Sequence, residues 1–107
     1  MDLTVQRKQR SNPRLRRRWR VDLKAGDTAV SYPAFTKDVS AGGFCAELMR
    51  VPSPGTQVRG SIVIGANAYA FSGKVAWALP SEPRMNLRGS IGVAFTEVAA
   101  NWKEKLT

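Results

Sequence analysis

Two short stretches in the first half of the sequence carry residue types that can hold an anionic ligand. The first is an arginine cluster that includes Arg16 and Arg20, and the second is Asp-Val-Ser-Ala-Gly-Gly, which supplies Asp38, Ser40 and Gly43. Arginine binds phosphate oxygens and guanine edges through paired N–H donors. A carboxylate accepts from N–H groups, a hydroxyl donates or accepts, and glycine lets the backbone turn sharply beside a ligand. Together the stretches predict a binding site for an anionic ligand.

The positive charge of the chain is concentrated at its N-terminal end. The whole sequence has 17 Lys and Arg against 8 Asp and Glu, a net charge of +9. Residues 1–20 hold eight basic residues and one acid, a net +7, whereas residues 21–107 hold nine against seven, a net +2. Residues 1–15 are also polar and interrupted by Asn-Pro. We therefore expect a flexible basic arm over residues 1–15 and a domain over residues 16–107.

Residue types that enzymes use are scarce in this chain. The sequence has no histidine, which removes the usual general base and the commonest metal ligand. One cysteine and scattered carboxylates make no zinc-binding spacing, and neither a Gly-Lys-Ser/Thr phosphate loop nor a Gly-x-Gly-x-x-Gly segment occurs. We expect a binding protein and not an enzyme, with no metal site and no cofactor.

Length and hydropathy indicate one small domain outside the membrane. A chain of 107 residues, 43% of them hydrophobic, has room for one core. No stretch approaches about 18 uninterrupted apolar residues, and the basic N-terminus lacks the apolar run of a secretory signal. Cys45 has no second cysteine with which to form a disulfide, which fits a reducing compartment. We expect a cytoplasmic protein.

Strand patterns punctuated by Gly and Pro fill most of the sequence after residue 20. Alternating or continuous apolar runs predict strands from residue 20 to a turn at 26–27, and then over 29–35, 44–49, 57–64, 68–79 and 86–95. Residues 37–43 are expected to form a polar turn, and residues 65–67 to close a hairpin. This spacing predicts a mainly β chain that forms a small antiparallel barrel.

The last residues change to a helical pattern. Val98, Trp102 and Leu106 recur at four-residue steps, and Thr96 is the expected N-cap. We therefore expect a C-terminal helix that packs on the barrel through Trp102. Trp19 is expected to anchor the arm to the barrel.

The two ligand-binding stretches, taken in order, resemble the motifs of the PilZ domain family. Residues 16–20 match an R-x-x-x-R motif directly before the first strand, and residues 38–43 match D-x-S-x-x-G. Residues 73–77 and 91–95 resemble later strands of that family, so the resemblance spans nearly the whole chain. It implies a six-stranded, split Greek-key barrel that is a receptor for cyclic di-GMP.

The resemblance assigns a role to each residue of the two motifs. Arg16 and Arg20 would contact the phosphates and the guanine O6 and N7 edges of cyclic di-GMP. Asp38 would accept from the Watson–Crick N–H groups of a guanine. Ser40 would hydrogen-bond at short range, and Gly43 would let the backbone come close to the ligand.

A second pair of arginines also has the R-x-x-x-R spacing. Arg14 and Arg18 also satisfy R-x-x-x-R, although Arg20 stands immediately before the strand, where the family's second arginine usually lies. In the preferred register Leu15 precedes the pair and cannot supply the extra guanidinium that holds a second ligand molecule, so one ligand per chain is expected. Arg17 and Trp77 are further candidate ligand contacts, because a tryptophan ring can stack on guanine.

Three functions are compatible with these residues. In the first, cyclic di-GMP orders the arm and the altered surface is read by an effector protein in motility, adhesion, polysaccharide export or development. In the second, the arm binds nucleic acid by counterion release, which the scarcity of interleaved aromatic residues disfavours. In the third, the chain keeps a PilZ-like fold for protein interaction without the ligand, which the intact R-x-x-x-R and D-x-S-x-x-G motifs disfavour. For the Asp38 segment taken alone, the alternative is an ordinary Asx-type turn.

Overall fold

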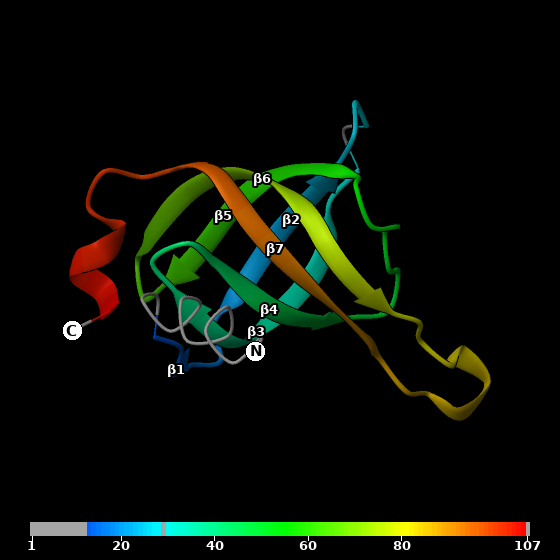
Figure 1. The fold of residues 1–107 in the computed structure, drawn as a ribbon. Helices are drawn as coiled ribbons and strands as arrows, with labels where there is room; N and C mark the ends of the chain where they lie inside the picture. Colours follow the sequence, from blue (N-terminus) through cyan, green and yellow to red (C-terminus); the bar gives the residue numbers. More distant parts are fainter. Residues whose placement is uncertain (1–12, 29, 107) are drawn as a thin grey trace, which may run out of the picture.

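A computed structural model describes residues 13–28 and 30–106, which fold into a closed antiparallel β-barrel (Figure 1). The elements in chain order are β1 (Leu15–Arg16), β2 (Arg20–Ala25), β3 (Tyr32–Ser40), β4 (Gly43–Leu48), β5 (Gln57–Ile64), β6 (Asn67–Leu79), the 3-10 helix η1 (Pro83–Met85), β7 (Gly89–Val98) and the 3-10 helix η2 (Trp102–Leu106). Six strands close the ring in the order β3-β2-β5-β6-β7-β4, and β1 is added beside β3. The predicted mainly β, six-stranded barrel is confirmed.

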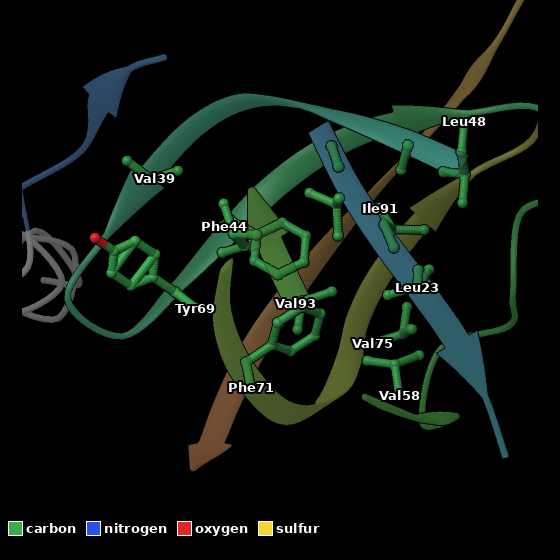
Figure 2. Packing of buried hydrophobic residues seen from close by; sticks show 14 of the residues in the cluster. Leu23, Val39, Phe44, Leu48, Val58, Tyr69, Phe71, Val75, Ile91 and Val93 are labelled. Atoms are coloured by element: carbon green, nitrogen blue, oxygen red, sulfur yellow. The ribbon is translucent and has the colours of Figure 1, made fainter. Parts of the chain in front are cut away.

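The core of the barrel is built from the inward-facing residues of the strands. In β2 the buried Val21 and Leu23 alternate with more exposed neighbours, as a strand with one face on the core requires. Figure 2 shows Phe44 and Phe71 close together inside the barrel, where their rings meet edge to face at a centroid distance of 5.1 Å. Cys45 is buried, as expected for a small core residue.

The predicted β5–β6 hairpin has the expected two strands and a tight turn. β5 covers 57–64 as predicted, and β6 begins one residue earlier than predicted, at Asn67. Gly65 in the turn has φ +62°, a left-handed conformation that glycine adopts without a steric penalty. The register then runs from Ile64 opposite Asn67 to Gln57 opposite Lys74.

The chain enters the barrel through one interrupted strand. β1 pairs with residues 38–39 of β3 and β2 pairs with residues 32–35, so both lie along the same strand. Thr36 bridges the interruption with its hydroxyl, which accepts from the Trp19 N–H at 2.8 Å and donates to the Arg17 carbonyl at 2.5 Å. The Trp19 ring meets Trp102 edge to face at 6.1 Å, so Trp19 does attach this segment to the barrel.

Several predicted element boundaries are wrong, and the strand expected over 29–35 spans Tyr32–Ser40 instead. The polar turn expected over 37–43 is shorter, because β3 continues to Ser40 and pairs with β4 up to Ser40 opposite Gly43. The last strand begins at Gly89 and not at residue 86, since Asn86 has φ +56° and ends η1. In both places cross-strand pairing extends or displaces a strand that local residue types alone would have ended elsewhere.

The predicted C-terminal helix is reduced to the 3-10 helix η2. Thr96 and Val98 belong to β7, where Val98 pairs with Phe71, so Thr96 caps no helix. The β6–β7 ladder therefore continues past the point where the four-residue periodicity predicts a helix. Trp102 is nevertheless fully buried against the barrel, as expected. Of the predicted flexible arm over 1–15, residues 1–12 lie outside the described residues, and Leu15 belongs to β1.

Candidate functional site

The turn between β3 and β4 is closed by the side chain of Ser40. The Ser40 hydroxyl donates to the Gly43 carbonyl and accepts from the Gly42 N–H, both at 3.3 Å. The residue is buried, with 5% of its surface exposed. This hydroxyl, and not the Asp38 carboxylate, therefore shapes the turn, and the carboxylate remains free for another partner.

The C-terminal segment holds the backbone of the same turn in place. The indole Nε1 of Trp102 donates to the Ser40 carbonyl at 2.9 Å, and the Trp102 ring is completely buried. Phe95 packs edge to face on Trp102 at 5.8 Å, which holds the ring in place. The backbone of the turn is thus fixed by residues from β7 and η2.

Gly43 is required by the close approach of β4 and β7. A Cβ atom at this position would lie 1.9 Å from the carbonyl oxygen of Val93, far inside contact distance. Gly43 is opposite Ala94 in the β4–β7 ladder and is buried. The expectation from sequence was a sharp backbone turn at this glycine, whereas the structure gives strand packing as the reason for it.

Arg14 and Asp38 form an ion pair at the mouth of this turn. The Arg14 guanidinium donates to the Asp38 carboxylate, and their side chains are 54% and 26% exposed. Leu15 opposite Val39 and Arg16 opposite Asp38 fix the register of β1 on β3, and this register carries Arg14 to the level of Ser40. A guanidinium and a carboxylate with these exposures remain accessible to a ligand from solvent.

The other arginines of the cluster lie in different surroundings. Arg16 is exposed, and its carbonyl accepts from the Arg17 guanidinium at 2.8 Å. Arg20 is on β2, where it forms an ion pair with Asp22 at 3.6 Å. Arg18 forms an ion pair with Glu47 at 3.3 Å. Of the arginines in residues 13–28, Arg14 alone contacts the D-x-S-x-x-G segment through its side chain, whereas Arg16 pairs with Asp38 through the backbone of the β1–β3 ladder.

A pocket of about 390 Å³ brings together Arg14 and part of the D-x-S-x-x-G turn, although Asp38 does not line it. Its lining residues come from the segment before β1, the β3–β4 turn, β6 and β7: Arg14, Ser40, Gly42, Gly43, Ala76, Trp77, Gly92, Val93 and Ala94. Arg16 and Arg20 do not line it. The pocket therefore brings one arginine, the turn and a tryptophan together, and leaves the two preferred arginines outside.

Trp77 lies on the wall of this pocket and not in the core. Its side chain is 39% exposed, and it packs so closely over Gly92 that a Cβ at residue 92 would lie 2.1 Å from the indole nitrogen. The glycine therefore provides the space in which the ring lies beside the turn. Sequence patterns gave no signal for Gly92, because its role depends on a cross-strand neighbour.

Cys45 lies opposite Asp38 in the β3–β4 ladder, so the charged groups near the turn affect the pKa of its thiol. Burial raises the pKa of the Cys45 thiol, and the Asp38 carboxylate adds to this rise, while Lys37 and Arg14 act in the opposite direction. Cys45 is thus a protonated core residue behind the site and not a nucleophile facing it.

Neither a metal-binding cluster nor a membrane-spanning helix occurs among the described residues. Among residues 13–28 and 30–106, no group of three or more His, Cys, Asp and Glu side chains is placed to hold a metal ion. Within the same part of the chain, no helix has the length and apolar character needed to cross a membrane.

Comparison with known proteins identifies the family. The model of the PilZ domain matches residues 8–107, and the chain belongs to this family. PilZ domains as a family are receptor and adaptor domains. A search of curated proteins gives no match.

One solved structure has a similar fold. It is described as the Bacillus subtilis inhibitor of motility (MotI/DgrA), and it superposes with a TM-score of 0.72 at 16% sequence identity. The match covers 91% of this chain but 47% of that protein, so the present chain spans about half the length of its structural neighbour. At this identity the similarity establishes the barrel fold.

Proposed function

We propose that this chain is a cyclic di-GMP receptor that binds its ligand between Arg14 and the Asp38–Gly43 turn and signals through a partner protein. The observation that carries the proposal is the ion pair between Arg14 and Asp38, because Arg14 also lines a pocket with Ser40, Gly43 and Trp77. Cyclic di-GMP has two phosphates and two guanines, and these residue types are complementary to both.

The Arg14–Asp38 ion pair is suited to exchange with such a ligand. Because both side chains are partly exposed, the pair contributes only about 0.2–1 kcal/mol and is easily opened. In the complex the Arg14 guanidinium would bind a phosphate or the guanine O6 and N7 edge. The Asp38 carboxylate would then accept from guanine N–H donors. Each ionic group exchanges its present partner for one supplied by the ligand.

A third arginine register follows from the position of Arg14. Arg10 precedes it by four residues, so Arg10-Ser11-Asn12-Pro13-Arg14 also has the R-x-x-x-R spacing. Arg10 lies outside the described residues. Arg16, Arg18 and Arg20 do not line the pocket that contains Arg14, and the Arg18 guanidinium lies over the Phe35 ring instead. We therefore favour Arg10 and Arg14 over both Arg14 with Arg18 and Arg16 with Arg20. Gln9 precedes Arg10 and supplies no extra guanidinium, so one ligand per chain is expected in this register too.

Trp77 provides a surface for a base in this proposal. Its partly exposed ring lies in the same pocket as Arg14, and stacking of a base on an aromatic ring contributes about 1–3 kcal/mol. The ring and the arginine would then contact different parts of one ligand. This contact would make Trp77 fluorescence a reporter of binding.

Signalling would begin at the segment that contains Arg14. Fixing one backbone residue costs about 1–2 kcal/mol, a cost that ligand contacts to Arg14 would help to offset. We infer that ligand binding fixes this basic segment and changes the surface beside it. An effector protein that recognises the altered surface would receive the signal.

The proposal is tested by calorimetric titration of the chain with cyclic di-GMP, and in parallel with GTP and a short RNA, at physiological salt. Selective binding of cyclic di-GMP with about one ligand per chain is the expected result. Salt-sensitive binding of the RNA without binding of cyclic di-GMP would instead identify the arginines as a nucleic-acid contact. Binding of neither would leave a PilZ domain that acts through protein contacts alone.

A further inference from the structure

A second pocket lies near the start of β3, away from the Asp38–Gly43 turn at its end. It has a volume of about 420 Å³, and its apolar lining includes Val30, Tyr32, Pro33, Phe35 and Met49. None of the residues of the proposed cyclic di-GMP site lines it. We call this pocket the β3–β4 groove.

The groove exists because β3 and the chain after β4 diverge. The β3–β4 ladder extends only as far as Phe35 opposite Glu47, whereas β4 goes on to Leu48 and pairs there with β7. Tyr32 and Pro33 are paired with β2 but not with β4. The side chains at this opening are therefore exposed: Val30 is 56% exposed and Met49 is 37% exposed.

Arginines surround the aromatic rings of the groove. The guanidinium carbon of Arg18 lies 4.8 Å from the centre of the Phe35 ring, and that of Arg88 lies 5.8 Å from the same ring. Arg50 is 5.7 Å from the centre of the Tyr32 ring. These cation–π contacts hold three positive charges around an apolar surface.

Among the described residues, carboxylates do not fully neutralise the positive charge of the groove. Glu47 is the one acidic residue in the lining, and it already pairs with Arg18 at 3.3 Å. Within the part of the chain that the structure describes, Arg50 and Arg88 have no carboxylate partner. Aromatic rings with arginines are also the residue types that contribute most binding energy in protein interfaces.

We propose that the β3–β4 groove binds an acidic segment of another protein, with an apolar side chain between Phe35 and Met49 and carboxylates on Arg50 and Arg88. Exposed apolar residues continue beside the groove on the β6–β7 hairpin, where Leu87 is 52% exposed and adjoins Arg88. Figure 1 shows this hairpin projecting beyond the barrel, at the end away from η2. The Ser81 hydroxyl donates to the Met49 carbonyl at 2.8 Å, which joins the hairpin to the groove.

Other occupants fit the groove less well. Residues 1–12 of this chain have three basic residues and one acid, so the arm would be repelled by Arg50 and Arg88. A symmetric pair of copies would place these arginines near their own equivalents, which is also unfavourable. For a nucleic acid, the Val30, Pro33 and Met49 side chains in the lining offer neither a flat ring for a base nor a donor for a phosphate.

The experiment is an NMR titration of the full chain, labelled with nitrogen-15, with the blocked peptide Glu-Asp-Glu-Leu-Phe-Glu-Asp. We expect chemical-shift changes at Tyr32, Phe35, Met49 and Arg88, with no need for cyclic di-GMP. The Arg50→Glu and Arg88→Glu double variant should weaken binding by about tenfold or more. Lys103→Glu, an exposed charge reversal on η2, is the matched control and should bind like the parent chain.

Two further probes complete the test. A peptide with lysine in place of each acid, and one with serine in place of leucine and phenylalanine, should both bind at least about tenfold more weakly. Absence of shifts in the groove at millimolar peptide, or equal binding by the double variant, would overturn the proposal. Stronger binding of a short oligouridine at the same residues, or self-association through them, would overturn it as well. These readouts are separate from the Asp38–Gly43 turn, so failure here leaves the cyclic di-GMP proposal unaffected.

Discussion

The indole Nε1 of Trp102 donates a hydrogen bond of 2.9 Å to the Ser40 carbonyl, which connects the C-terminal 3-10 helix directly to the turn of the candidate site. The Trp102 ring is fully buried and contacts Trp19, Tyr69 and Phe95. One side chain therefore joins the segment before β2, the β3–β4 turn and the end of the chain.

Substitution of Trp102 by phenylalanine should lower the free energy of unfolding by about 1–3 kcal/mol or more. The buried Ser40 carbonyl would lose its donor, and a smaller ring would leave a cavity. The measurement is chemical denaturation followed by circular dichroism. Trp77→Phe is the matched control, because that ring is 39% exposed and should cost much less. Equal losses in the two variants would contradict the role assigned to Trp102.

Replacement of Thr36 by valine should destabilise the junction between β1 and β2. Valine has nearly the same shape as threonine but has no hydroxyl, so the Trp19 N–H and the Arg17 carbonyl would lose their partner. We expect a loss of about 1–3 kcal/mol in unfolding free energy and faster amide exchange at Leu15 and Arg16. Thr36→Ser retains the hydroxyl and should preserve the slow exchange. Unchanged exchange in the valine variant would show that the junction does not depend on this hydroxyl.

Cys45 should react slowly with iodoacetamide at pH 8 in the native chain and rapidly after unfolding. Burial and the Asp38 carboxylate raise the pKa of this thiol, so the thiolate is disfavoured in the folded state. Because the folded pKa lies above the unfolded one, the Cys45 contribution to stability is present below the unfolded pKa, about 8.5, and is lost as the pH rises through the folded pKa. Asp38→Asn should quicken the reaction modestly, since burial is the larger cause. Rapid alkylation of the native parent chain would refute this description.

The choice of arginine pair predicts that Arg10→Ala and Arg20→Ala will differ in their affinity for cyclic di-GMP. If Arg10 and Arg14 bind the ligand, Arg10→Ala should weaken cyclic di-GMP binding about ten- to hundredfold, the cost of a charge-assisted hydrogen bond. Arg20→Ala should have little effect, because Arg20 does not line the pocket that contains Arg14. Calorimetry on the two variants decides between the registers. A large loss for Arg20→Ala with none for Arg10→Ala would support Arg16 and Arg20 instead.

The fold was largely predictable because most of the strands carry their own local signals. The apolar alternation and the Gly65 turn predict β5 and β6 to within one residue. The C-terminal helix was wrong because the strand character of Val98 depends on Phe71, a neighbour in space that sequence periodicity does not contain. Long-range pairing decided that segment, and local periodicity did not.

The turn and the arginine of the candidate site also differ in how far the sequence predicts them. The turn residues follow one another in sequence, so the D-x-S-x-x-G pattern was sufficient to find Ser40 and Gly43 in one turn. Which arginine meets this turn depends on the interruption between β1 and β2, and that interruption is held by Thr36 from another strand. Arg14 was therefore only an alternative in the sequence analysis, although it is the arginine that contacts Asp38.

The central claim is that cyclic di-GMP binds between Arg14 and the Asp38–Gly43 turn, and its most direct test is calorimetric titration of Arg14→Ala beside the parent chain. The matched control is Arg84→Ala, which removes an equal charge from the exposed β6–β7 hairpin. The account predicts about one ligand per parent chain, unchanged binding by the control, and an affinity about ten- to hundredfold weaker for Arg14→Ala. Equal affinity of the parent chain and Arg14→Ala would contradict it.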